Sequence, residues 1–512
     1  MRSRPWILPA IVVGLSIAVS TLSSHTAFAQ VSLPVTLLAR ERTTRFEYDT
    51  ARTLLAPLPD SDPQARLERG RLALHEGRCV DATRFLEGAT QDDGPLVESI
   101  AKGCARVTAG TRVVLNKDKG VEIVFQDEND VPLAEWISDT VALARDAITR
   151  DLESTWTLPT RVLLVRDHLS LSATTGLPYE NARKTGIVAI AKWGRVTMIS
   201  PRATGHGFMW RETLAHELTH LAITKATTDR APLWLQEGLA KTEENAWRPA
   251  SVFDNRPSPS GLSRFGIDKK MDLALDKLGP SLAMLPNADI AAVAYAEVTS
   301  FVQFYRKSVG PKSFPELLKS IDAGRTVDEA LVERSGKTLK EWDVLWRKSL
   351  EAVKPEPLVQ PREGDPKAMR EWRKRRRLAE LLHQAGRSGA AAKELGRATL
   401  PADDPYGRAL AAVVDWSLVA VQVQSAGAPK PQLSSAWTKL GDETKLPYSH
   451  AAWWFVRGLL FRESGDLDGA SRAFRESAGE NPNNPDLVCG EQAFSAFCPS
   501  AKAYSVPPFS GE

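Results

Sequence analysis

This sequence of 512 residues has almost no excess of charge of either sign and few long apolar runs. The formal net charge is only +3, so nothing in the composition indicates a nucleic-acid or anionic-membrane partner. Hydrophobic residues make up 43% and charged residues 25%, which is typical of a soluble globular protein and excludes a disordered or fibrous chain. The one basic run, residues 370–377 (REWRKRRR), lies in a helical pattern and is interpreted as a solvated helix face.

Only the N-terminus carries an extended apolar stretch, over residues 6–19, behind two arginines. The small-x-small triplet AFA follows at residues 27–29. This order is the pattern of a secretory signal peptide covering residues 1–29, so we expect an exported protein, periplasmic or extracellular. The stretch is short for a membrane span and no later segment approaches that length, so we expect no span after cleavage. An uncleaved N-terminal anchor is the alternative.

Cysteine is also rare, and the four cysteines fall into two local sets, Cys79 with Cys104 and Cys489 with Cys498. In an exported protein each set is a candidate disulfide. Zinc binding by four thiolates is the competing interpretation. Because the sequence has no CxxC, the spacing typical of such zinc sites, we favour the disulfides.

Helical hairpins are predicted near both ends of the chain. In residues 65–89, small and apolar residues recur at helical spacing, break at a glycine and resume, which indicates a helix, a turn and a second helix. Residues 454–482 (WFVRGLLFRESGDLDGASRAFRESAGENP) repeat this frame, and residues 379–398 carry a weaker copy. The pattern resembles the tetratricopeptide repeat, with a generic helical hairpin as the alternative. We therefore expect repeat-like helices over residues 30–110 and 367–512, which could bind a protein partner.

The middle of the chain combines strand patterns with helix patterns, which predicts an α+β domain over residues 111–352. A proline-rich linker is predicted over residues 353–366. Alternating apolar residues predict a hairpin, and a short apolar run predicts a buried strand. Further helices follow from Tyr295 onward. The expected elements are a hairpin over 112–125, a helix over 136–152, a strand over 161–165, and two strands over 186–192 and 195–200 joined by a tight turn.

Residues 212–222 (ETLAHELTHLA) contain the spacing HExxH. Side chains four apart on a helix lie about 40° apart around its axis, so His216 and His220 can point two imidazoles at one ion. Glu217 is rotated by about 100° from His216, which puts its carboxylate beside the ion, where it can accept a proton from water. This is the zinc chemistry that the motif encodes, although so short a motif also arises by chance.

Other features of this region favour a zinc site. Leu214, Leu218 and Leu221 form a stripe on the opposite side of the helix, so the histidines do not point into the leucine core. Catalytic zinc takes three protein ligands and keeps one open position. Glu237 lies in an apolar segment, PLWLQEGLA, where a carboxylate needs a partner, with an exposed helix carboxylate as the alternative. The sixteen residues between His220 and Glu237 allow a second helix to return to the ion.

HELTH followed by PLWLQEGLA resembles the gluzincin zinc metallopeptidases, in particular the peptidase MA-like domains of exported bacterial proteins. The resemblance implies a thermolysin-like catalytic domain that binds one zinc ion through His216, His220 and Glu237, with Glu217 as the general base. It also implies that Tyr295, opening a helix in AYAEVTSFVQFYRKSVG, donates a hydrogen bond to the oxyanion; a packed helix aromatic is the alternative.

The likeness covers roughly residues 111–353 and lacks a GxMEN-like segment, which puts aminopeptidase activity in doubt. It implies that residues 195–200 form an edge strand along which an extended peptide pairs. His206 and Glu212 lie near the motif without an assignable role. The sequence thus predicts a secreted zinc metallopeptidase acting on peptides or proteins. The alternatives are a repeat-type scaffold protein of the cell envelope with a non-catalytic zinc-binding domain, and a zinc hydrolase acting on a non-peptide amide.

Overall fold

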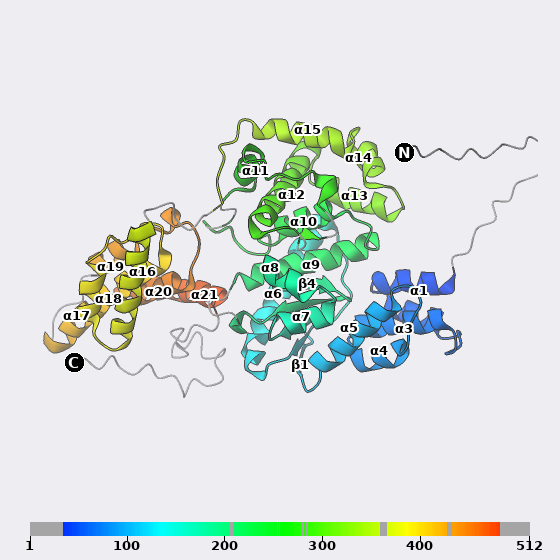
Figure 1. Ribbon diagram of the computed structural model, residues 1–512, viewed down its shortest axis with the longest axis horizontal. Coiled ribbons are helices and arrows are strands. Elements are labelled where there is room, and N and C mark those ends of the chain that lie inside the picture. Colours follow the sequence, from blue (N-terminus) through cyan, green and yellow to red (C-terminus); the bar gives the residue numbers. More distant parts are fainter. Residues whose placement is uncertain are drawn as a thin grey trace, which may run out of the picture. The chain divides into compact units, whose positions relative to one another are not determined.

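The computed structural model describes residues 34–203, 208–252, 254, 257–278, 281–282, 285–358, 366–426 and 433–481 (Figure 1). The predicted signal peptide, His206, Cys489 and Cys498 therefore lie outside the described residues. Within the described ranges, no helix combines the length and the apolar character that a membrane crossing requires.

From residue 34 onward, where the described part of the chain begins, five helices precede the sheet, and their packing follows the predicted helix, turn and helix. The side chain of Asp62 caps the third helix, and Gly70 on that helix lies against Leu86 on the fourth. A Cβ atom at Gly70 would lie 2.4 Å from Leu86 Cγ, so the small residue is what allows the two helices to approach. Cys79 and Cys104 form a disulfide that joins the fourth and fifth helices. These helices are α1 (Val35–Thr44), α2 (Tyr48–Leu55), α3 (Pro63–His75), α4 (Cys79–Leu86) and α5 (Gly94–Val107).

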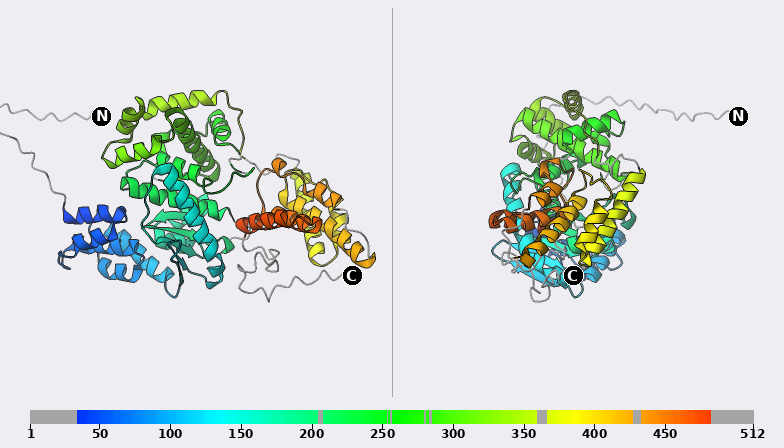
Figure 2. Two further views of the ribbon diagram at one scale, coloured as in Figure 1. Left: turned by 180° about the vertical axis from the view of Figure 1, so that it is seen from behind. Right: turned by 90° about the vertical axis from the view of Figure 1, so that its left-hand side faces the viewer.

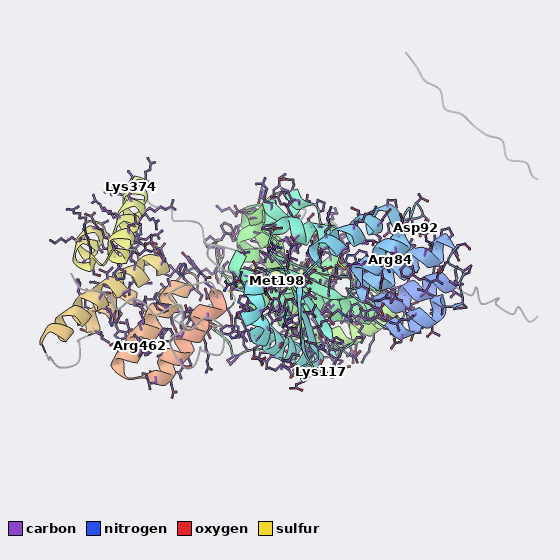
Figure 3. The ribbon with its side chains drawn as sticks, turned by 90° about the horizontal axis from the view of Figure 1, so that it is seen from below. Arg84, Asp92, Lys117, Met198, Lys374 and Arg462 are labelled. Atoms are coloured by element: carbon purple, nitrogen blue, oxygen red, sulfur yellow. A yellow bond between two sulfur atoms is a disulfide. The ribbon has the colours of Figure 1, made fainter. Side chains whose placement is uncertain are left out.

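The predicted strands form one five-stranded mixed sheet with the order β1-β2-β3-β5-β4. The three inner strands β2, β3 and β5 run parallel, and an antiparallel hairpin closes each side. Met198 on β5 is fully buried among the side chains of the sheet (Figure 3). The strands are β1 (Arg112–Asn116), β2 (Val121–Phe125), β3 (Thr160–Val165), β4 (Ala189–Lys192) and β5 (Arg195–Ile199).

The expectation that residues 195–200 form the edge strand is wrong. This segment is β5, which pairs with β3 on one side and with β4 on the other, so β4 is the edge. The cause is the two-residue turn Trp193-Gly194, where both residues have positive φ (55° and 65°). Such a turn folds one strand directly back on the next. Because β5 is already paired with β3, β4 takes the outer position.

Helices cover both faces of the sheet, and together with the strands they confirm the predicted α+β class. Val121, Ile123 and Phe125 alternate inward as predicted and join the main core with α6 and α9. In Figures 1 and 2 the helices α11 to α15 lie together above the sheet. The helices of this region are α6 (Ala134–Leu152), α7 (His168–Thr175), α8 (Tyr179–Thr185), α9 (Trp210–Thr227), α10 (Leu233–Glu243), α11 (Pro259–Asp268), α12 (Ala288–Val309), α13 (Ser313–Asp322), α14 (Val327–Ser335) and α15 (Leu339–Leu350).

The predicted linker begins where α15 ends, but its first part is held in place. Glu356 accepts hydrogen bonds from the backbone and the hydroxyl of Ser258 (2.8 and 2.7 Å), and its own amide donates to the Gly261 carbonyl (2.9 Å). Residues 353–358 therefore run along the start of α11 rather than as a free connection. Residues 359–365 lie outside the described part of the chain.

The C-terminal helices confirm both hairpins predicted there. Gly458 on the first helix of the second hairpin lies against Phe474 on the second helix, as expected for the small and large positions of the repeat. Within the basic run, Arg375 pairs with Glu394 (2.8 Å) and Arg376 with Asp404 (2.9 Å), while Lys374 lies on the exposed surface of its helix (Figure 3). The helices are α16 (Pro366–Gln384), α17 (Ser388–Leu395), α18 (Pro405–Ala426), α19 (Ser434–Leu440), α20 (Ala451–Ser464) and α21 (Leu467–Glu480).

Candidate metal centre

Helix α9 carries the HExxH residues through the middle of the domain. Its 18 residues include no glycine or proline, and the C-cap residue Thr228, directly after the helix, adopts the left-handed conformation with φ of 53°. Leu214 and Leu218 are fully buried in the main core, as the leucine stripe predicted. The two histidines lie one turn apart on the side that faces α10.

Three donor atoms meet between α9 and α10. His216 Nε2 lies 3.2 Å from His220 Nε2, and Glu237 Oε2 lies 3.4 and 3.5 Å from these two nitrogens. A tetrahedral zinc ion with bonds of about 2.0–2.1 Å places its ligand atoms about 3.3 Å apart, which matches this spacing. Glu237 Oε2 is buried and no hydrogen-bond donor satisfies it, a deficit that a cation would remove. In the described parts of the chain, no other set of three His, Cys, Asp or Glu side chains is close enough to share an ion.

Helix α10 brings Glu237 to this position. It packs against α9 after a short connection, as the spacing of the two motifs predicted, and Pro232 occupies its N-cap position. Gly238 sits where α10 crosses α12. A Cβ atom there would lie 2.7 Å from the Val298 carbonyl oxygen and 2.4 Å from Val302 Cγ2, so only glycine permits this approach. The glycine of WLQEG thus sets how close α12 comes to the metal centre.

The histidines and the carboxylates of the centre shift one another's pKa values. Burial lowers the pKa of His216, but the carboxylates of Glu237 and Glu244 more than offset it and raise the pKa to about 9. Burial likewise raises the pKa of Glu237, yet the two histidines hold it well below the usual range of a carboxyl group. The site therefore favours positive charge between its side chains, supplied by protons or by a metal ion that competes with them.

Glu217 stands beside the three donor atoms and makes a different contact. Its Oε2 accepts a hydrogen bond of 2.6 Å from the backbone amide of Ala191 on the edge strand β4. Burial raises the pKa of Glu217, and the nearby His220 and His216 oppose that shift. Glu217 is only 7% exposed. Its burial and the hydrogen bond from Ala191 hold the carboxylate between the edge strand and the three donor atoms.

Tyr295 lies on α12 with its ring centroid 6.3 Å from that of His216. The expectation that it opens a helix is wrong, because the Asn287 side chain caps α12 and the helix begins at Ala288. Tyr295 therefore lies two turns inside the helix. Burial raises its pKa well above the normal value, and the carboxylates of Glu237 and Glu217 add to that shift. The hydroxyl accordingly stays protonated and able to donate.

Glu244 is a member of the site that the sequence analysis missed. Its Oε2 lies 3.5 Å from His216 Nδ1, and its Oε1 accepts a hydrogen bond of 2.5 Å from Lys241 Nζ. Glu237, Lys241 and Glu244 are spaced by four and three residues, so the helical period could have placed all three on one face of α10. Glu212, which had no assignable role, pairs with Arg248 at 2.8 Å.

Replacing Glu244 with glutamine is expected to weaken zinc binding about 10-fold or more, because carboxylates that orient a histidine ligand typically contribute that much to metal affinity. The measurement is competitive titration with a zinc chelator. Glu243→Gln is the matched control, since the neighbouring carboxylate faces Arg306 (3.3 Å) instead of His216. Equal zinc affinities of the two variants would remove Glu244 from the site.

Two segments of the chain match models of known families. Residues 179–352 match the family model of the peptidase MA superfamily, and residues 438–485 match a tetratricopeptide repeat. No curated protein matches the chain. Among solved structures, that of yeast LTA4 hydrolase in complex with bestatin is similar at a TM-score of 0.29 and 11% sequence identity. That alignment covers 76% of this chain and 64% of the other, so this chain spans less than two thirds of that protein.

The metal centre lies within the matched segment, which begins at Tyr179 and contains all three donor residues and Glu217. Residues 179–352 therefore belong to a metallopeptidase-like domain of the peptidase MA superfamily. The chain combines this domain with a C-terminal tetratricopeptide repeat.

Proposed function

We propose that this protein is a zinc-dependent metallopeptidase that hydrolyses peptide bonds. The observation that carries the proposal is the mutual spacing of the donor atoms of His216, His220 and Glu237, which matches that of tetrahedral zinc ligands. One of these atoms, Glu237 Oε2, is buried without a hydrogen-bond donor, and Glu217 is held beside them. A zinc ion held by these three side chains would supply Lewis acidity that polarises a carbonyl group and lowers the pKa of water.

Glu217 is the proposed general base. Its carboxylate takes a proton from the attacking water and passes it to the nitrogen of the leaving amine. The Ala191 amide donates to Oε2 of this carboxylate, which fixes its orientation and leaves Oε1 to accept the proton. No other carboxyl group of the centre is free for this role, because Glu237 lies among the donor atoms and Glu244 is engaged with Lys241.

The edge strand β4 is the proposed docking line for the substrate backbone. Lys192 and Arg195 flank a two-residue turn and form the hydrogen-bonded pair that closes the hairpin. The alternation along β4 then turns the backbone groups of Ala189 and Ala191 outward. The Ala191 amide donates to Glu217, which leaves the Ala191 carbonyl oxygen and the backbone groups of Ala189 for a peptide. An extended peptide can pair with such an open edge, and here the edge passes directly beside Glu217.

Tyr295→Phe is expected to lower kcat by about 100-fold with little change in KM, because the hydroxyl acts on charge that develops only in the transition state. Steady-state kinetics with one peptide substrate measure both constants. A packed aromatic without a catalytic role predicts a different result, in which kcat stays within a few-fold of the wild-type value.

The N-terminal signal pattern supports export, and we propose that the mature chain acts in the periplasm or outside the cell. The tetratricopeptide repeat supports a protein partner and, with it, a second candidate function. In that function the chain is an envelope scaffold whose peptidase-like domain binds zinc without catalysis. Glu217→Gln separates the two candidates, since a scaffold keeps its biological activity in this variant.

Metal analysis of the purified mature chain tests the proposal first. After dialysis against micromolar zinc, we expect one zinc ion per chain, released by a chelator and lost in His220→Ala. A chain that binds no zinc under these conditions would exclude both the metallopeptidase and the zinc-binding scaffold.

A further inference from the structure

The tip of the β4–β5 hairpin is seated in an aromatic cluster of the N-terminal helices. The ring of Trp193 meets the ring of His75 edge-on, with centroids 5.7 Å apart, and Tyr48 and Phe46 lie around the same histidine. Burial lowers the pKa of His75 to about 3, so the ring packs as a neutral group. A Cβ atom at Gly194 would lie 2.2 Å from the Tyr48 hydroxyl oxygen. The turn therefore has no space to shift toward these helices.

The residue after the turn is anchored to the same helices by its guanidinium group. Arg195 is 4% exposed, and it donates to the Leu74 carbonyl oxygen at 3.0 Å and to Cys104 Sγ at 3.2 Å. The disulfide between Cys79 and Cys104 fixes the position of that sulfur. A buried guanidinium is costly to leave without partners, so these contacts hold the start of β5 against α3 and α5.

This anchor lies only a few residues along the hairpin from Ala191, which contacts the proposed general base Glu217. The register pairs Lys192 with Arg195 and Ala191 with Val196, so β4 follows any movement of the turn and of the start of β5. Ala191 in turn donates to Glu217 at 2.6 Å. A continuous series of contacts thus runs from the N-terminal helices, through the hairpin, to the carboxylate beside the metal centre.

We propose that the N-terminal helices α1–α5 position the edge strand β4 and are a permanent part of the peptidase unit. Tyr48, His75 and Arg195 are its positioning residues. In this role the segment is neither a removable propeptide nor a separate recruiting arm. The catalytic consequence rests on the proposed peptidase function, whereas the structural coupling can be measured without it.

Gly194→Asn in the full mature chain tests the coupling, because asparagine tolerates positive φ and the added side chain meets Tyr48. We expect amides of residues 187–192 to exchange hydrogen at least about 10-fold faster, with zinc content unchanged. We also expect kcat to fall about 100-fold, since small displacements of catalytic groups have effects of that size. Adding Tyr48→Phe removes the atom in collision and is expected to restore both values.

Gly110→Asn is the matched control, because Gly110 has φ of 69° and nothing within 4 Å of an added Cβ. His75→Ala probes the same contact without adding atoms and is expected to speed exchange in the same segment. Unchanged exchange of residues 187–192 in both Gly194→Asn and His75→Ala would overturn the proposal, as would failure of Tyr48→Phe to rescue Gly194→Asn. If the exchange results hold while the wild-type chain hydrolyses no peptide, the positioning role stands and the peptidase function fails.

Discussion

Replacing Glu217 with glutamine is expected to lower kcat by about 10³-fold, within the range that a positioned general base contributes. Glutamine keeps the size of the side chain and still accepts the Ala191 amide hydrogen bond, but it cannot take a proton from water. The measurement is steady-state hydrolysis of a peptide by the zinc-loaded variant, with its zinc content determined in parallel.

Glu212→Gln is the control for this variant, because it makes the same change on the same helix α9 at a carboxylate that pairs with Arg248. It is expected to keep kcat near the wild-type value. Hydrolysis by Glu217→Gln at the rate of the control, with zinc bound in both, would show that another group moves the proton.

Glu237→Gln is expected to weaken zinc binding by more than about 100-fold, because loss of a direct ligand should exceed the 10- to 100-fold effect of groups that only orient a ligand. The amide removes the negative charge that lies 3.4 and 3.5 Å from the two histidine nitrogens. Competitive chelator titration measures the affinity, and activity at sub-micromolar free zinc should vanish in parallel. Zinc affinity equal to that of wild type would place the ion elsewhere.

The local parts of the site could be predicted from the sequence because helical periodicity encodes them. The spacing of His216 and His220 fixes their common face, and the apolar setting of Glu237 identified a carboxylate in need of a partner. Glu244 lies on the same helical face, but it comes after the apolar segment PLWLQEGLA, so no apolar setting marks it as a carboxylate in need of a partner. The start of α12 could also be predicted from the sequence, because asparagine, here Asn287, is a favoured N-cap residue.

The non-local parts could not be predicted in the same way. The edge position of β4 depends on the pairing of β5 with β3, two strands separated by more than twenty residues, and no local pattern states that pairing. The contact between Ala191 and Glu217 uses a backbone amide, which every residue type except proline carries. Gly238 was visible in the sequence, but its role depends on the path of α12 across α10.

The structure divides the work of the centre among separate elements. Helices α9 and α10 hold the three donor atoms, β4 orients the carboxylate of Glu217, and α12 brings the ring of Tyr295 near that of His216. Each element is in turn fixed by packing outside the site, at Gly238 for α12 and at the Trp193-Gly194 turn for β4. Stability of these remote contacts should therefore matter to catalysis as well as to folding.

The most direct test is hydrolysis of an unfolded protein such as casein by purified residues 30–512, beside Glu217→Gln, with zinc present and after chelation. A zinc metallopeptidase with Glu217 as its general base is expected to show hydrolysis by the wild-type chain alone, loss of that activity on chelation, and its recovery when zinc is restored. Equal hydrolysis by both proteins, or wild-type activity that survives complete removal of zinc, would contradict this proposal.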